Sequence, residues 1–333
     1  PRDPLASLTT RQLAGQRMVV GYVGTRVPGW LLARVRRGEV GGVIAFSANV
    51  RSRGALAAQM RRLQRVSRPV GPPLLTMIDQ EGGLVARLPG APSGSAAEMG
   101  RRGAAYVRRQ GLLTAANLRR AGMNVNLAPV VDLGRPGSYQ ARTGRAFARS
   151  PSAVAALGSA FVGGLQQGGV AAALKHFPGV GGGAPDEDLV VQTVALSRAT
   201  LRRTDEVPFA AAIRAGARLV MTSTARYPAL DRRVAMLSRP ITTTELRGRL
   251  GFRGVAITDD LDVIAMRPLA GPGELAVQAT AAGNDLLLFA HDPDRARRGL
   301  NAVVAAVRSG RLSRAALVAS VRRVVALRGA VAR

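Results

Sequence analysis

The stretch Ala171-Ala172-Ala173-Leu174-Lys175-His176-Phe177 is an apolar run that ends with a lysine, a histidine and a phenylalanine. It is one of eight short, nearly continuous hydrophobic runs that alternate with amphipathic segments along the chain. The other seven are 18–22, 42–46, 74–78, 125–131, 219–222, 255–258 and 286–289. Parallel strands that are covered on both faces have this pattern. We therefore expect a parallel sheet in which 171–177 is the fifth strand.

Helical patterns fill the intervals between these runs. They are expected at 28–37, 54–66, 96–121, 152–167, 201–215, 242–250, 273–282 and 294–309, with a last helix at 314–327. This alternation predicts an α/β fold, a single-domain (β/α)8 or TIM barrel over 1–333 with its core at about 8–327. A doubly wound open sheet is the alternative, but no Gly-x-Gly-x-x-Gly motif follows the first strand.

The composition limits the classes of partner. The formal net charge of +28 is compatible with nucleic acid, anionic lipid headgroups or an acidic cell-wall polymer. The arginines are dispersed, however, and aromatic residues make up only 4% of the chain, so we expect no nucleic-acid role. No apolar stretch is long enough to span a membrane, and no cysteine is present for disulfides or thiol ligands.

Lys175 is the single lysine among 48 basic residues, and its neighbour His176 is one of two histidines. An ammonium is a compact charge whose pKa shifts readily on burial, unlike that of a guanidinium. Asp79, Asp132 and Asp259 directly follow three other apolar runs. Because the carboxyl ends of barrel strands share one rim, these groups should converge there.

Carboxylates, a lysine and arginines at one rim suit a ligand with neighbouring hydroxyl groups. The set therefore fits a sugar site, with Asp259 as a nucleophile or as a group that stabilises an oxocarbenium ion. A divalent metal is the alternative, but only one histidine lies nearby and the familiar ligand spacings are absent. We therefore expect no metal.

Six motifs, in order and spacing, make the chain resemble the family 3 glycoside hydrolases, specifically their single-domain β-N-acetylglucosaminidases, from about Leu8 to Leu327. They are Ile78-Asp79-Gln80-Glu81-Gly82-Gly83 with Arg87, Asn126-Leu127-Ala128-Pro129-Val130-Val131-Asp132, Gly144-Arg145-Ala146-Phe147, Lys175-His176-Phe177-Pro178-Gly179, Tyr227-Pro228-Ala229 and Ile257-Thr258-Asp259-Asp260-Leu261. The resemblance implies a retaining β-glycosidase without metal or organic cofactor. Its implied substrates are terminal β-N-acetylglucosamine residues of peptidoglycan-derived saccharides, and a β-glucosidase-like preference is the alternative.

The resemblance also implies a role for each site residue. Asp79, helped by Arg87, would bind the hydroxyls at C4 and C6 of the sugar in the −1 subsite. Asp259 would attack the anomeric carbon and form a covalent glycosyl-enzyme. Three residues would hold the neighbouring hydroxyls: Arg145, Lys175 and His176.

The chain departs from the family pattern where the acid/base catalyst should be. Val180 and Asp188 stand where the family has histidines, the second of which protonates the leaving group, and Thr224 replaces another histidine. Leu84 stands in place of an arginine, and His291 is expected to be an ordinary loop residue.

Three interpretations of these departures stay open. Asp188, or alternatively Glu187, could be the acid if its pKa is raised, although a glycine-rich, solvated loop works against this. The acid could come from a partner. The protein could also be a weakly active or non-catalytic saccharide-binding relative, since losing a general acid costs about 10²–10⁴ in rate.

The sequence gives a weaker indication of location. The chain begins at Pro1 and not at a methionine, which is compatible with a removed secretion signal and with a trimmed sequence. Together with the charge and the implied wall-derived substrate, this favours a place outside the cytoplasmic membrane. The sequence gives no indication of the oligomeric state.

Overall fold

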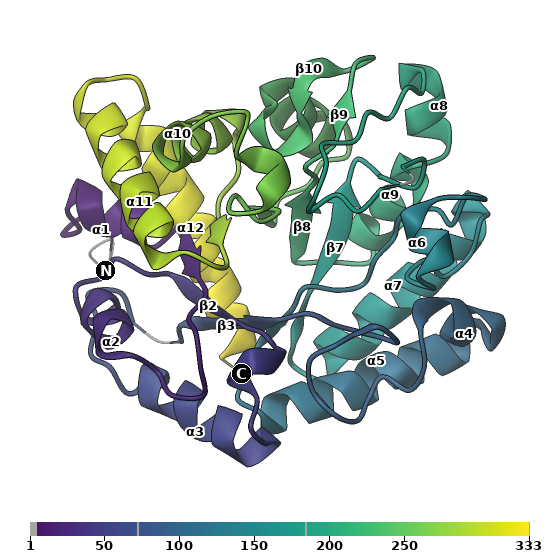
Figure 1. The fold of residues 1–333 in the computed structure, drawn as a ribbon, viewed down its shortest axis with the longest axis horizontal. Coiled ribbons are helices and arrows are strands. Elements are labelled where there is room, and N and C mark those ends of the chain that lie inside the picture. The colour runs from purple at the N-terminus through teal and green to yellow at the C-terminus, as the bar shows by residue number, and fades with distance from the viewer. Residues whose placement is uncertain (1–4, 72, 184, 333) are drawn as a thin grey trace.

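The computed structural model describes residues 5–71, 73–183 and 185–332. Its main sheet has eight parallel strands in the order β11-β8-β7-β6-β3-β2-β1-β12, and a bridge between Ile257 and Leu286 joins its two ends. The strands are β1 Met18–Val20, β2 Gly42–Ala45, β3 Leu75–Ile78, β6 Val125–Asn126, β7 Ala171–Phe177, β8 Leu219–Thr222, β11 Val255–Thr258 and β12 Leu287–Phe289. Helices surround them (Figure 1). The predicted (β/α)8 barrel is confirmed.

Helices of the described residues follow the predicted order. They are α1 Thr10–Gly15, α2 Gly29–Arg36, α3 Arg53–Gln64, α4 Ala96–Arg101, α5 Gly103–Arg120, α6 Tyr139–Arg142, α7 Pro151–Gln167, α8 Arg198–Arg203, α9 Glu206–Arg214, the π-helical η3 Pro240–Arg249, α10 Pro272–Ala282, α11 Pro293–Arg308 and α12 Arg314–Val331. The expected helix at 96–121 is divided into α4 and α5 at Gly103, whose φ is +82°. The short helices α1 and α6 were not predicted.

Shorter elements lie between these helices and strands. Two hairpins, β4 Gln80–Gly82 with β5 Val85–Ala86 and β9 Arg226–Tyr227 with β10 Asp231–Val234, extend from the barrel. Single 3₁₀ turns are η1 Ser47–Asn49, η2 Ala235–Leu237 and η4 Ile264–Met266. The β4–β5 hairpin directly follows β3, and η4 follows β11, so both elements belong to the carboxyl-terminal face of the barrel.

The two-residue repeat of a strand determines which side chains face the barrel interior. In β11, Ile257 belongs to the interior core, whereas Ala256 belongs to the core beneath the helices. The next inward position falls at Asp259, the first residue after β11. The same alternation places Asp79 two residues after the interior Met77 of β3. Asp79 and Asp259 therefore face the barrel interior, like the apolar side chains two residues before them, and lie at the carboxyl ends of their strands.

Helix α12 closes the opposite, amino-terminal end of the barrel. Val324, Leu327 and Val331 of this helix belong to the interior core. The buried Arg328 donates hydrogen bonds to Gln16 Oε1 at 2.7 Å and to the carbonyl of Gly41 at 2.8 Å, just before β1 and β2. Side chains of α12 consequently fill the amino-terminal end of the barrel, and a ligand can enter at the carboxyl-terminal end.

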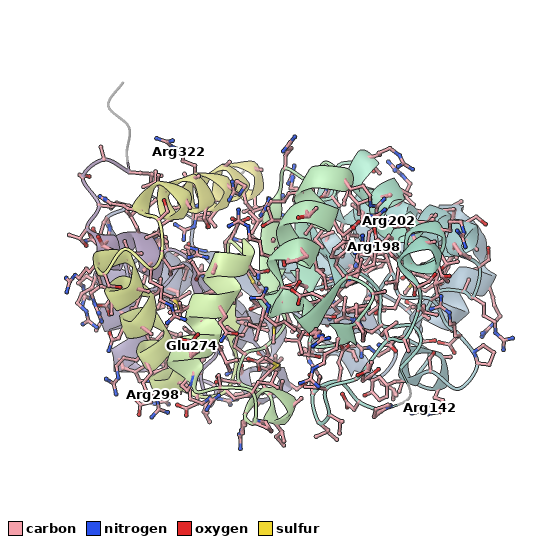
Figure 2. The ribbon with its side chains drawn as sticks, turned by 90° about the horizontal axis from the view of Figure 1, so that it is seen from above. Arg142, Arg198, Arg202, Glu274, Arg298 and Arg322 are labelled. Carbon is pink, nitrogen blue, oxygen red and sulfur yellow. The ribbon has the colours of Figure 1, made fainter. Side chains whose placement is uncertain are left out.

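The basic residues are distributed around the helical shell. Figure 2 places Arg142, Arg198, Arg298 and Arg322 at separate positions on α6, α8, α11 and α12. This dispersion accords with the expectation that nucleic acid is not a partner, which stays a prediction. Among the described residues, no helix combines the length and the apolar character needed to cross a membrane.

The role of α12 can be tested by unfolding. We expect Leu327→Ala to lower the free energy of unfolding by about 2–4 kcal/mol, because it leaves a cavity in the barrel interior. Leu113→Ala on α5 is the matched control; the side chain of Leu113 is 43% exposed, and the change should be within about 0.5 kcal/mol. Urea unfolding followed by circular dichroism measures both values. Equal losses in the two variants would contradict this role of α12.

Candidate active site

A pocket of about 180 Å³ lies at the carboxyl ends of the strands. This volume is below the ~300 Å³ at which sites for drug-sized ligands begin, so it suits a single small ring. All the predicted site residues line this pocket, namely Asp79, Arg87, Arg145, Lys175, His176, Glu187, Asp188 and Asp259. The structure therefore brings together residues that the sequence places on four different strands and their loops.

Lys175 lies between two carboxylates on the pocket floor. Its Nζ is 2.7 Å from Asp79 Oδ1 and 2.8 Å from Glu81 Oε1. Arg145 donates two hydrogen bonds to Glu81, from Nε at 2.8 Å and from Nη2 at 2.9 Å. Glu81 was not predicted as a site residue, although it lies within the same motif as Asp79.

These contacts determine the charge states on the floor. Burial by itself lowers the pKa of Lys175, but the carboxylates of Asp79 and Glu81 outweigh this effect and raise it. Burial raises the pKa of Glu81, but Arg145 and Lys175 together bring it well below its ordinary range. Lys175, Glu81 and Arg145 are therefore all ionised at neutral pH, and together they can bind hydroxyl groups as donors and acceptors.

His176 is held in place by Asp132. The imidazole Nδ1 is 2.7 Å from Asp132 Oδ2, and the same carboxylate accepts the backbone N–H groups of His176 and Val180. His176 Nδ1 is also 3.4 Å from Glu187 Oε1. Burial lowers the pKa of the imidazole, but Glu187 and Asp132 outweigh it and raise the pKa to about 9. The imidazole therefore has a fixed orientation, and its charge depends on that of Glu187 beside it.

The acidic loop after β7 is only partly the solvated segment that the sequence suggested. Tyr139 Oη donates to Asp186 Oδ2 at 3.0 Å, and the N–H of Ala265 donates to the carbonyl of Asp188 at 3.1 Å. Glu187, between these two contacts, is buried. The hydroxyl of Thr224 lies 3.4 Å from Glu187 Oε2. The expectation of a solvated carboxylate was therefore wrong for Glu187.

The two candidate acids of this loop differ in environment. Burial raises the pKa of Glu187 to about 8; His176 opposes this shift and Asp259 adds to it. Among the described residues, Glu187 Oε1 has no hydrogen-bond partner. Asp188 is exposed, and partial desolvation together with the charge of Asp259 raises its pKa to about 6. At neutral pH Glu187 is mostly protonated, whereas Asp188 is mostly ionised.

One group in the pocket could hold a metal ion. Within the described part of the chain, His176, Glu187 and Asp259 offer ligand atoms that all lie within 4.8 Å of one another. One imidazole and two carboxylates are suitable ligands for zinc. Glycoside hydrolysis with two carboxylates needs no metal, so the expected absence of a metal and of any organic cofactor stays a prediction.

One wall of the pocket was missed in the sequence. The His291 ring stacks on Phe46 with centroids 5.4 Å apart, and the Arg87 guanidinium lies 5.7 Å from the Phe46 ring centroid. His291 Nε2 is 3.3 Å from Asp260 Oδ2. The expectation that His291 is an ordinary loop residue was therefore incomplete, because it lines the pocket. Phe46 and His291 both lie at strand ends, which is the signal that could have found them.

Comparison with known proteins places the chain in a family. Residues 22–327 match the model of the glycosyl hydrolase family 3 N terminal domain. The chain is 38% identical to an uncharacterized secreted glycosyl hydrolase of Arthroderma benhamiae, with 97% of this chain and 94% of that protein covered. It is 37% identical to a beta-hexosaminidase of Xylella fastidiosa, with 86% of each covered.

Solved structures agree with this match. A glycoside hydrolase family 3 beta-N-acetylglucosaminidase from Paenibacillus sp. str. FPU-7 has a TM-score of 0.93 and 36% identity, and the match covers 98% of this chain but 63% of that chain. The Beta-N-acetylhexosaminidase from Beutenbergia cavernae has a TM-score of 0.89 and 32% identity, with 97% and 99% covered. With its barrel, its pocket and the family model in agreement, this chain belongs to glycoside hydrolase family 3.

Proposed function

We propose that this protein is a retaining β-N-acetylhexosaminidase that removes terminal β-linked N-acetylglucosamine. The observation that carries the proposal is the separation of two carboxyl groups. Oxygen atoms of Glu187 and Asp259 lie within 4.8 Å of each other. Retaining glycosidases hold their two carboxyl groups about 5–5.5 Å apart, whereas inverting ones need about 6.5–9.5 Å to admit a water molecule. The names of the relatives support the N-acetyl preference.

Asp259 is the proposed nucleophile. Its Oδ1 accepts the backbone N–H of Asp260 at 2.9 Å, which orients the carboxylate and leaves Oδ2 for attack. Attack on the anomeric carbon forms a bond to Asp259 as the bond to the leaving-group oxygen breaks. Water then displaces Asp259 from the opposite side, so the anomeric configuration is retained.

Glu187 is the proposed acid/base catalyst, in preference to Asp188. Its carboxyl is buried and, with a pKa of about 8, protonated at neutral pH, so it can give its proton to the departing oxygen. The resulting carboxylate then takes a proton from the attacking water. Asp188 is exposed and its pKa of about 6 leaves little of the acid form at neutral pH.

The remaining polar groups of the pocket are proposed to bind the sugar. Asp79 and Arg87 would hold the hydroxyls at C4 and C6, and three side chains would hold the others: Arg145, Lys175 and His176. We further propose wall-derived saccharides as substrates and a location outside the cytoplasmic membrane. The charge of +28 and the secreted glycosyl hydrolase among the relatives support this location.

Trapping tests the nucleophile. We expect a dinitrophenyl 2-deoxy-2-fluoro-β-glycoside to add one glycosyl mass to the protein, because dinitrophenolate departs without protonation, and we expect Asp259→Asn to show no adduct. Intact mass spectrometry measures both. The fluoro sugar lacks the acetamido group, so turnover of dinitrophenyl β-N-acetylglucosaminide is measured beside it. Neither adduct nor turnover would indicate a non-catalytic saccharide-binding relative.

Leaving-group dependence tests the acid. We expect Glu187→Gln to lower kcat/KM for methyl β-N-acetylglucosaminide by about 10²–10⁴, because the methoxide must be protonated as it leaves. The loss for the dinitrophenyl substrate should be less than about tenfold, because that leaving group needs no proton. Asp188→Asn is the matched control and should alter both values alike. If Asp188→Asn instead shows the selective loss, Asp188 is the acid.

The pH profile gives a further test. Because the pKa of Glu187 is raised, its acid form persists up to about pH 8 and is lost above it. We expect kcat/KM for the methyl substrate to fall as the pH rises through about 8. With the dinitrophenyl substrate, whose leaving group needs no proton, neither the wild type nor Glu187→Gln should show a fall at that pH. A falling limb near pH 6 would indicate Asp188 instead.

A further inference from the structure

We propose that a second cavity, lined by four arginines and remote from the active site, binds a small molecule that carries a phosphate monoester. This arginine cavity has a volume of about 460 Å³ and lies between α10, η3, α11 and α12. It includes Arg17, just before β1, and Asn284, shortly before β12, so it adjoins the amino ends of strands. None of the described residues lines both this cavity and the active-site pocket. The inference therefore goes beyond the proposed function and does not rest on it.

Positive charge exceeds negative charge around the arginine cavity. The four arginines that line it are Arg17, Arg239, Arg311 and Arg323. None of the described residues that line it carries a carboxylate. Two carboxylates beside it pair with two of the arginines: Glu274 lies 2.5 Å from Arg311, and Asp285 lies 2.8 Å from Arg323. Four cations against two carboxylates leave an excess of two positive charges.

Arg17 is the buried cation of this set. It is 1% exposed and forms no ion pair with a described carboxylate. Its guanidinium donates to the carbonyls of Asn284 and Asp285 and to Thr280 Oγ1, which are neutral acceptors. Burial lowers the pKa of Arg17 to about 10, which leaves it a cation at neutral pH. Because a guanidinium has five N–H groups, Arg17 keeps donors for a ligand after these three bonds.

Acceptors near the arginine cavity are already occupied by donors of the protein itself. At the end of α10, Thr243 Oγ1 donates to the carbonyl of Ala282 at 2.8 Å, and Arg247 donates to the carbonyl of Gly283 at 3.4 Å. The exposed side chain of Arg239, by contrast, has no hydrogen bond or ion pair with any described residue. Unused donors and excess positive charge favour an anion as the ligand.

The charge and the volume of the cavity indicate which anion it suits. A phosphate monoester carries a charge of about −1.5 to −2 at pH 7 and three acceptor oxygens, so it matches an excess of two positive charges. Arginine also binds phosphate oxygens in pairs. A cavity of about 460 Å³ falls within the range of small-molecule sites, so it has room for an organic group beside the phosphate. The apolar Leu312 and Leu317 line it and can contact the carbon atoms of that group.

Isothermal titration calorimetry with methyl phosphate tests this inference. At about 0.15 M salt, where binding by dispersed surface charge is screened, we expect one saturable site with a Kd below about 1 mM. Dimethyl phosphate, which carries a single charge, should bind about tenfold more weakly. Arg239→Gln should weaken the binding of methyl phosphate by about three- to tenfold. Arg298→Gln is its matched control, because Arg298 is exposed on α11 and does not line the cavity.

A second pair of variants adds a carboxylate. Ala316→Glu places a negative charge on the lining and should weaken the binding of methyl phosphate by about tenfold or more. Ala315→Glu is its matched control and should stay within about twofold of the wild type, because its charge is screened outside the cavity. Both alanines are exposed in the first turn of α12, where a carboxylate stabilises a helix, so both variants should fold.

Three results would overturn the proposed site. They are the absence of saturable methyl phosphate binding, equal affinities for methyl and dimethyl phosphate, and equal weakening by a variant and its matched control. The last result would mean that the net charge of +28, and not the cavity, attracts the anion. Turnover of N-acetylglucosaminides should be the same in all four variants, because none of these positions lines the active-site pocket. A failure of the proposed function would therefore leave this test unaffected.

Discussion

The ion pairs of Lys175 hold the pocket together. Its ammonium joins a strand-five residue to Asp79 and Glu81, which come from the segment after β3. Without it, two carboxylates would face each other with only Arg145 to offset their charge. Removing one partner from a buried pair typically costs about 3–5 kcal/mol. A compact ammonium can lie between two carboxylates at 2.7 and 2.8 Å, and this accounts for a lysine in a chain that otherwise uses arginine.

Sequence reasoning predicted the barrel and the pocket floor because both follow from local periodicity. Nearly continuous apolar runs predicted the strands. The polar residues at the ends of these runs predicted three members of the site: Asp79, Lys175 and Asp259. The burial of Glu187 could not be predicted in this way. It accompanies hydrogen bonds from Tyr139 of α6 and Ala265 of η4 to the residues on either side of Glu187, and these elements approach the loop only in the folded chain. The division of α4 from α5 was missed because one glycine inside a helical pattern is ambiguous.

Two neighbouring carboxyl groups of the loop after β7 have different proton affinities because their surroundings differ. Glu187 is buried, with one oxygen that accepts no hydrogen bond from the described residues, whereas Asp188 faces solvent. Pairs of groups with separated pKa values are how glycosidases divide acid and nucleophile roles. In the proposed mechanism, the buried carboxyl of Glu187 takes the role of acid/base catalyst that the family resemblance assigns to a histidine.

The filling of the barrel by α12 has a consequence for the order of events. Since Val324 and Leu327 fill the barrel interior at its amino-terminal end, a ligand enters and leaves the pocket at the carboxyl-terminal end. In the proposed mechanism, the leaving alcohol departs through that end before water reaches the sugar held on Asp259. The freed sugar, lying deepest, is then the last to depart and occupies the place that the next substrate needs. Accumulating free sugar would therefore compete with the substrate for the pocket and slow turnover. The proposed reaction would follow ping-pong kinetics, in which the alcohol leaves before water reacts.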